Sequence, residues 1–245
     1  FESLGSTWRQ TDTITHVGSM QFGNSVAVDV DTLVVGAVGS NAAYVFDLTT
    51  SGWVEDTNSV LAGVANSAFG TDVAIDAGRI IVGSPDAAGN GSATIYVKSA
   101  SGWDFEQTLT ASDGAADHDF GRSVDISGDW LIVGAPAERA VTYPYPWPFQ
   151  YLGIDGPITG AAYVFEHSEG VWGENDKLAL DDGAGDDKFG FSVSIQGDRA
   201  LIGSPGRDVI TVDNVTLVNA GQGFTYGYKD GVWKRDTANA QQGTG

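Results

Sequence analysis

The stretch DFGRSVDISGDWLIVGAP, residues Asp119–Pro136, decides the fold because the chain repeats its pattern. The other copies are QFGNSVAVDVDTLVVGA from Gln21, AFGTDVAIDAGRIIVGSP from Ala68 and KFGFSVSIQGDRALIGSP from Lys188. In all four copies a Phe-Gly pair comes first, and a second glycine lies 14 residues after the phenylalanine. A unit repeated along a chain is the sequence mark of a repeat architecture.

Each copy continues into a short apolar run and then a turn rich in Gly, Ser and Asp that ends at a tryptophan. Nine residues separate the start of each run from its tryptophan, in the pairs Tyr44 and Trp53, Thr94 and Trp103, Tyr163 and Trp172, and Phe224 and Trp233. We therefore expect four strands per unit, a to d: the FGxSV segment, the LIVGA run, the AYVF run and the segment that opens at the tryptophan. Adjacent apolar residues in b indicate a strand covered on both faces.

Repeated four-stranded units of about 40 to 50 residues are typical of a β-propeller, in which sheets stack radially. Phe-Gly followed 14 residues later by Gly-Ala-Pro resembles the FG-GAP repeat, which occurs in the propeller of integrin α subunits and in many bacterial surface and secreted proteins. The resemblance covers about residues 22–238 in four copies. It implies an all-β propeller built of four-stranded antiparallel blades.

We expect residues 1–245 to form a single propeller domain, with blades at about 16–62, 63–112, 113–181 and 182–238. Residues 1–15 resemble one extra outer strand, in which Trp8 has the place of the tryptophan that opens strand d in the repeats. Four units and this strand fit either a closed four-bladed ring or part of a larger ring. Family members usually close at seven blades, which implies part of a ring, a homo-oligomer or a larger assembly.

The amino-acid composition limits the kinds of partner that the protein can bind. Twelve Lys and Arg against 32 Asp and Glu give a net charge of −20, which disfavours binding to nucleic acid. The longest apolar runs are too short to cross a bilayer, and no basic-then-apolar leader opens the chain. The chain has no cysteine, so it has no disulfides. Together with the resemblance, the acidic composition favours a secreted or cell-surface protein that does not span the membrane.

Nearly all length variation between the repeats lies in the connection from strand b to strand c. From the glycine of b to the start of c the separations are 8, 11, 29 and 21 residues. Because strands alternate in direction, the b–c and d–a connections emerge on one face of the propeller. The a–b turns on the other face are short in every repeat. Long loops on a rigid scaffold are where binding surfaces are usually built, so we expect the ligand on the b–c and d–a face.

The longest b–c connection contains TYPYPWPFQY, which sets an aromatic residue at every second position. In a β-like extension these side chains share one side and form a platform for a sugar or a protein. In a polyproline II helix the same side chains point in different directions around the axis, so only some of them can contact one partner. The remaining alternative is a lid packed on its own blade or on a neighbouring subunit. The candidate ligand-binding residues are Tyr143, Tyr145, Trp147, Phe149 and Tyr151.

Two d–a connections, SDGAADHDFG and DDGAGDDKFG, are rich in aspartate. Asp and Gly together make tight turns, but several carboxylates also supply oxygen ligands to Ca²⁺. The integrin-type calcium loop lies between strands a and b, where these turns are too short to hold it. We therefore expect any bound Ca²⁺ to lie in the d–a connections. The candidate metal ligands are Asp113, Asp117, Asp119, Asp182, Asp186 and Asp187.

Catalysis has little support in the sequence. The three histidines lack metal-ligand spacing, and no nucleophile elbow, phosphate loop or zinc motif is present. Asp117 and Asp186 could form an acid–base pair across adjacent blades, so a polysaccharide-degrading enzyme is a further, less favoured alternative. The sequence favours an extracellular adhesion or binding module for a protein or glycan partner. A lectin-like propeller is the alternative.

Overall fold

The structure is a computed structural model and describes residues 2–57, 59–114, 118–137, 139–142, 154–210, 213 and 215–236. Strands dominate these ranges. The helical elements described are two three-residue 3₁₀ turns, η1 (Val38–Ser40) and η2 (Ala87–Gly89). Within the same ranges, no helix has the length and apolar character that crossing a membrane requires.

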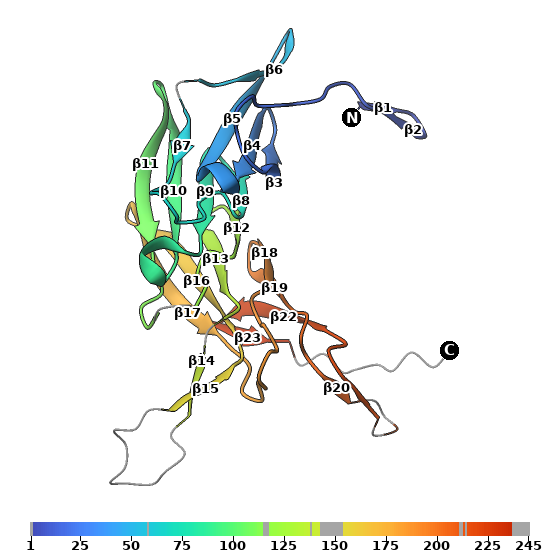
Figure 1. The fold of residues 1–245 in the computed structure, drawn as a ribbon, viewed down its shortest axis with the longest axis vertical. Coiled ribbons are helices and arrows are strands. Elements are labelled where there is room, and N and C mark those ends of the chain that lie inside the picture. Colours follow the sequence, from blue (N-terminus) through green and yellow to red (C-terminus); the bar gives the residue numbers. More distant parts are fainter. Residues whose placement is uncertain are drawn as a thin grey trace.

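Four antiparallel sheets form the four predicted blades (Figure 1). Blade 1 consists of β3 (Phe22–Asp29), β4 (Thr32–Ala37), β5 (Ala42–Thr49) and β6 (Gly52–Glu55), and the short β7 (Leu61–Ala62) also pairs with β5. Blade 2 consists of β8 (Val73–Asp76), β9 (Arg79–Ser84), β10 (Ser92–Ser99) and β11 (Gly102–Leu109). Blade 3 consists of β12 (Ser123–Ser127), β13 (Trp130–Ala135), β16 (Ala161–Ser168) and β17 (Val171–Leu178). Blade 4 consists of β18 (Ser192–Gln196), β19 (Arg199–Ser204), β22 (Gln222–Lys229) and β23 (Val232–Arg235).

Three two-stranded hairpins lie outside the blades. Their strands are β1 (Glu2–Leu4) with β2 (Thr7–Arg9), β14 (Arg139–Thr142) with β15 (Ile154–Ile158), and β20 (Val209–Ile210) with β21 (Thr216–Leu217).

Consecutive blades pack face to face through apolar cores. Each core contains the tryptophan that opens strand d of the later blade, and these side chains are buried: Trp103, Trp172 and Trp233. A side chain of the preceding blade also accepts a hydrogen bond from the backbone amide of this tryptophan. The Trp172 amide, for example, donates to the Gln107 side chain at 3.0 Å. The predicted stacking of four-stranded blades is therefore confirmed.

The two glycines of each repeat explain the constant spacing. Within blade 3, the Gly121 amide donates to the carbonyl of Gly134 at 3.1 Å, which closes the a–b hairpin. Between blades, Gly83 lies against the carbonyl of Gly121, where an added Cβ would collide with it. Gly121 has a φ of +95° and in turn lies against the carbonyl of Ser92. Glycine is needed here both for its conformation and for the close approach of two backbones.

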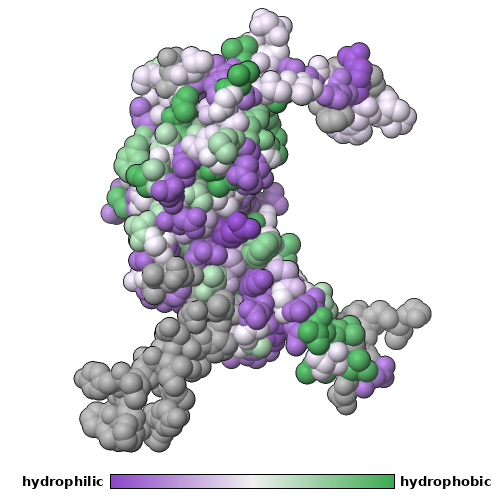
Figure 2. Space-filling view, in the orientation of Figure 1, coloured by the Kyte–Doolittle hydropathy of each residue, from purple (hydrophilic) through white to green (hydrophobic). Residues whose placement is uncertain are grey.

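The four blades form an open arc and not a closed ring (Figures 1 and 2). Blade 1 lies at one end of the arc and blade 4 at the other. The outer face of blade 4 is uncovered: Leu201 is 50% exposed, whereas its counterparts Val34, Ile81 and Ile132 are fully buried. At the other end, Gly23 has no atom within 4 Å of an added Cβ, unlike Gly121. The four described blades therefore do not close into a four-bladed ring, and whether they form part of a larger ring stays a prediction.

The N-terminal segment does contain the expected strand, but this strand does not join a blade. β2 pairs with β1, and Trp8 is 72% exposed. Further along, Ile14 packs on the apolar face of blade 1, beside Tyr44 and Phe46. Ile14 follows Trp8 by six residues, as the buried Leu109 follows Trp103. The end of this segment therefore packs as the end of an outer strand would, while its start forms a separate hairpin.

Candidate binding site

The elaborated side of the arc is built by the connections from b to c and from d to a, which we call the loop face. In blades 1 and 2 the b–c connections form the short turns η1 and η2. In blades 3 and 4 they carry the hairpins β14–β15 and β20–β21, which project away from the arc (Figure 1). The described parts of these two longer connections thus form strands outside the blades.

The β20–β21 hairpin carries exposed aliphatic side chains. They are visible as a green cluster on the arm at the lower right of Figure 2. Ile210 and Val218 are each 70% exposed, and Val215 and Leu217 are about half exposed. Apolar residues gathered on a protruding element are more informative than scattered ones, because such patches on soluble domains commonly mark interaction sites.

The aromatic stretch predicted as a ligand platform lies between β14 and β15. Its residues Tyr143, Tyr145, Trp147, Phe149 and Tyr151 lie outside the described residues. The platform, the polyproline arrangement and the lid all stay predictions.

The first aspartate-rich connection, between blades 2 and 3, is held by side chains of blade 3. Asp113 accepts hydrogen bonds from the Tyr163 hydroxyl at 2.8 Å and from the Lys177 ammonium at 2.7 Å. Burial raises the pKa of Asp113, but these hydrogen bonds and the charge of Lys177 outweigh it and leave the pKa below its usual value. The carboxylate is therefore kept charged by a protein cation.

The second aspartate-rich connection is held by Arg207. Its guanidinium donates to Asp187 at 2.7 Å and to Asp182 at 2.6 Å. Asp187 is almost fully buried, and it also accepts the amide of Ala184 at 2.8 Å. Burial lowers the pKa of Arg207, but its two carboxylate partners raise it overall. A metal ion at Asp182 and Asp187 would have to compete with this arginine.

Asp119 and Asp186 line one hollow of about 250 Å³ together with Arg122 and Lys188. Asp117 lies outside the described residues, so its pairing with Asp186 stays a prediction. Within the described ranges, no group of three or more acidic or histidine side chains is arranged to hold a metal ion. The calcium site stays a prediction.

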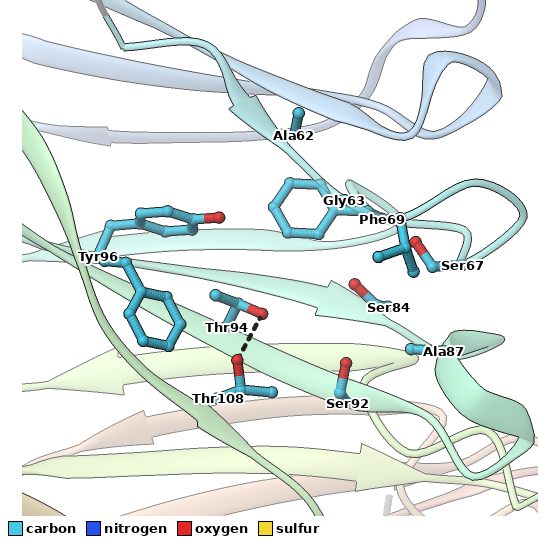
Figure 3. A pocket seen from close by; sticks show the side chains of 12 residues that line it. Ala62, Gly63, Ser67, Phe69, Ser84, Ala87, Ser92, Thr94, Tyr96 and Thr108 are labelled. Carbon is cyan, nitrogen blue, oxygen red and sulfur yellow. Dashed lines mark hydrogen bonds between the residues drawn. The ribbon is translucent and has the colours of Figure 1, made fainter.

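A pocket of about 300 Å³ lies on the loop face between blades 1 and 2 (Figure 3). The d–a connection of blade 1 forms one wall, and blade 2 forms the others. None of the described residues that line it carries a charge. Its polar lining consists of hydroxyl groups, from Ser67, Ser84, Ser92, Thr94, Tyr96 and Thr108.

The pocket exists because blade 2 lacks a ring that the other repeats have. Thr94 occupies the position of Tyr44, Tyr163 and Phe224. In blade 3 the Tyr163 ring packs against Phe120, with ring centroids 5.4 Å apart, and in blade 4 Phe224 packs against Phe189 at 5.5 Å. Threonine leaves that volume empty beside Phe69.

A second substitution enlarges the pocket toward its loop side. Ser67 lies two residues before the Phe-Gly pair, as Asp187 does in blade 4, and Ala87 corresponds to Arg207. In blade 4 the arginine fills the space and pairs with the aspartate. In blade 2 the methyl group of Ala87 does not reach as far. Ser67 is 2% exposed, and its hydroxyl has no hydrogen-bond partner among the described residues.

These pocket residues were not among the predicted site residues. One signal was visible in the sequence: Thr94 is the non-aromatic member of an otherwise aromatic position. The contribution of Ser67 could not be seen, because it depends on a contact between two connections of unequal length.

Strand order, stacked cores and paired glycines define an all-β protein of the propeller class. The chain belongs to the FG-GAP repeat family, whose model matches residues 8–46, 103–165 and 172–217, more than half of the sequence. No curated protein sequence matches it.

Among solved structures, the chain is similar to the crystal structure of Saccharomyces cerevisiae Sqt1, with a TM-score of 0.48 and 10% sequence identity. The match covers 85% of this chain and 48% of the Sqt1 chain, so this chain spans about half the length of that protein.

Proposed function

We propose that this protein is an extracellular or cell-surface binding module that recognises a protein partner through its loop face. The observation that carries the proposal is the β20–β21 hairpin, which holds four exposed aliphatic side chains away from the arc. FG-GAP propellers are often binding or adhesion domains, and their repeats are typical of extracellular proteins. The net charge of −20 is compatible with protein and glycan partners and opposes nucleic acid.

A protein partner suits the hairpin better than a glycan does. Its exposed groups are aliphatic, and burying such groups is a main source of affinity at protein interfaces. Sugars present hydroxyl groups that aliphatic side chains cannot satisfy.

The test uses the double variant Ile210→Ser with Val218→Ser on an array of purified extracellular and cell-surface proteins. Wild type is expected to bind at least one of them, and the double variant should bind it at least about tenfold more weakly, because two aliphatic contacts are lost. Val171→Ser is the control, since Val171 is 58% exposed at the c–d turn on the opposite face.

Equal binding by all three proteins, or no binding by wild type, would contradict the proposal. Native mass measurement accompanies the array. If the hairpin joins copies of this chain instead, wild type will have the mass of an oligomer, and the double variant will have the mass of a monomer.

A further inference from the structure

The pocket between blades 1 and 2 has the features of a built ligand site and not of a packing defect. Its buried residues Phe69, Ser67 and Ser84 are each 2% exposed, so the floor is closed. A buried hydroxyl without a partner costs free energy, and native proteins leave few such groups. The Ser67 hydroxyl is one of them, and it lines this pocket. A ligand that hydrogen-bonds to Ser67 would remove that cost.

The lining selects the chemistry of the ligand. Each hydroxyl group both donates and accepts hydrogen bonds, so a ring of hydroxyls matches a ligand that also carries hydroxyls. The Thr94 and Thr108 hydroxyls lie 3.5 Å apart across strands β10 and β11 and point into the pocket (Figure 3). No hydrogen bond in the described part of the chain uses the side chains of Ser84 or Ser92, so they are available too.

An aromatic wall completes the site. Tyr96 and Phe105 lie edge to face, with ring centroids 6.4 Å apart, and Phe105 is 63% exposed at the pocket mouth. Aromatic faces pack well against the C–H face of a sugar ring, which leaves the sugar hydroxyls free for the serines and threonines. Burial raises the pKa of Tyr96, so its phenol stays protonated and can donate.

The uncharged lining disfavours ionised small ligands, and the volume limits the size of the ligand. Among the described residues, the lining contains no Lys or Arg to hold a carboxylate or phosphate, and the protein's net charge of −20 repels anions. The same described lining contains no Asp or Glu to hold a cation. A volume of about 300 Å³ lies at the small end of ligand pockets, which typically range from about 300 to 1,000 Å³.

We propose that this pocket binds a neutral sugar residue, either a monosaccharide or the end of a glycan. This site is separate from the β20–β21 hairpin and does not rest on the protein-binding proposal.

The test measures binding of glucose, galactose, mannose and N-acetylglucosamine by ligand-observed NMR and calorimetry, with glucuronate as the charged comparison. At least one neutral sugar should bind, and glucuronate should bind more weakly than that sugar. Ser67→Ala removes one hydroxyl and should weaken binding about fivefold. Ser101→Ala, a hydroxyl deletion at the c–d turn of the same blade, should leave binding unchanged.

A filling variant gives the sharpest result. Thr94→Phe restores the ring found in blade 4 and should abolish sugar binding while keeping or raising the melting temperature. If Thr94→Phe does not fold, Ala87→Leu blocks the same pocket from its loop side. The proposal is overturned if no neutral sugar in the panel binds, or if the bound sugar binds the filled variant as well as wild type, and the pocket then holds only water. Thr94→Phe should leave protein binding by the hairpin intact, so the two proposals fail separately.

Discussion

At the scale of single residues, the repeat works because two glycines meet where one blade touches the next. The glycine of Phe-Gly has a positive φ in all four blades. Where a preceding blade is present, its backbone lies directly against that glycine. Gly23 and Gly121 therefore have the same conformation but different surroundings, which separates the effect of conformation from the effect of packing.

Replacing each of these glycines with alanine should give unequal losses of stability. Gly23→Ala should cost about 1 to 2 kcal/mol, because only the positive φ disfavours alanine. Gly121→Ala should cost about 3 kcal/mol or more, because its Cβ also collides with the carbonyl of Ser92. Urea unfolding of both variants measures the difference. Equal losses would show that the blades do not approach this closely in solution.

Asp72 is the other residue that the repeat pattern singles out, because it stands where the other blades have Ser25, Ser123 and Ser192. Its carboxylate accepts hydrogen bonds from the Ser25 hydroxyl at 2.6 Å and from the Val124 amide at 2.8 Å. It thus joins blades 1, 2 and 3. Burial raises the pKa of Asp72 above its ordinary value, and these hydrogen bonds offset that effect only in part.

The raised pKa predicts how stability depends on pH. An unfolded Asp titrates near pH 3.9. Between that value and the higher folded pKa, the folded chain holds a proton that the unfolded chain has lost, so stability falls as pH rises through this window. The free energy of unfolding of wild type relative to Asp72→Asn should therefore fall from about pH 4 upward and then level off. Urea titrations of both proteins at several pH values check this. A difference that rises with pH would mean that the pKa is lowered.

At the scale of strands, side chains of one blade close the free edge of the next. The amide of Gly128 on blade 3 donates to Asp76 at 2.6 Å, and the amide of Ile195 on blade 4 donates to Asp125 at 2.7 Å. The inner strand of a blade has an unpaired edge, and these carboxylates satisfy one amide on that edge, at Ile195, and one in the a–b turn next to it, at Gly128. Much of the aspartate in this acidic chain is therefore structural.

The elements differ in how far they follow from the sequence. The four strands of each blade follow from constant spacings, because those spacings reflect hairpins closed by local hydrogen bonds. Trp8 has the sequence context of an outer strand, but outer-strand pairing needs a strand c beside it, and β2 pairs with β1 instead. Arg207 lies 20 residues or more from the carboxylates that it holds. Such long-range partners cannot be read from loop composition, whereas the missing ring at Thr94 was visible in the repeat alignment.

At the scale of the whole molecule, the arc ends in two unlike faces. The first face of blade 1 is aromatic around Tyr44 and Phe46, where the N-terminal segment covers it, whereas Val26 and Val28 on the same face are exposed. There, the His16 ring lies 3.9 Å from that of Tyr44. The outer face of blade 4 is uncovered around Leu201 and carries smaller and more polar residues, such as Ser194 and Thr225. Blade 4 should therefore be less stable than blades 2 and 3, because a blade covered on one face buries less apolar surface.

Alanine substitutions at equivalent positions test whether the arc is open in solution. Ile132→Ala should cost about 2 to 5 kcal/mol, since Ile132 is fully buried between blades 3 and 4. Leu201→Ala should cost about 1 kcal/mol or less, because half of that side chain is already in water. Urea unfolding at two protein concentrations measures both. If the blade 4 face is covered by a second copy, the cost of Leu201→Ala will rise with concentration, because association stabilises only the folded chain. If the chain closes on itself, the cost will approach that of Ile132→Ala at both concentrations. A small, concentration-independent cost is the result expected of an open arc.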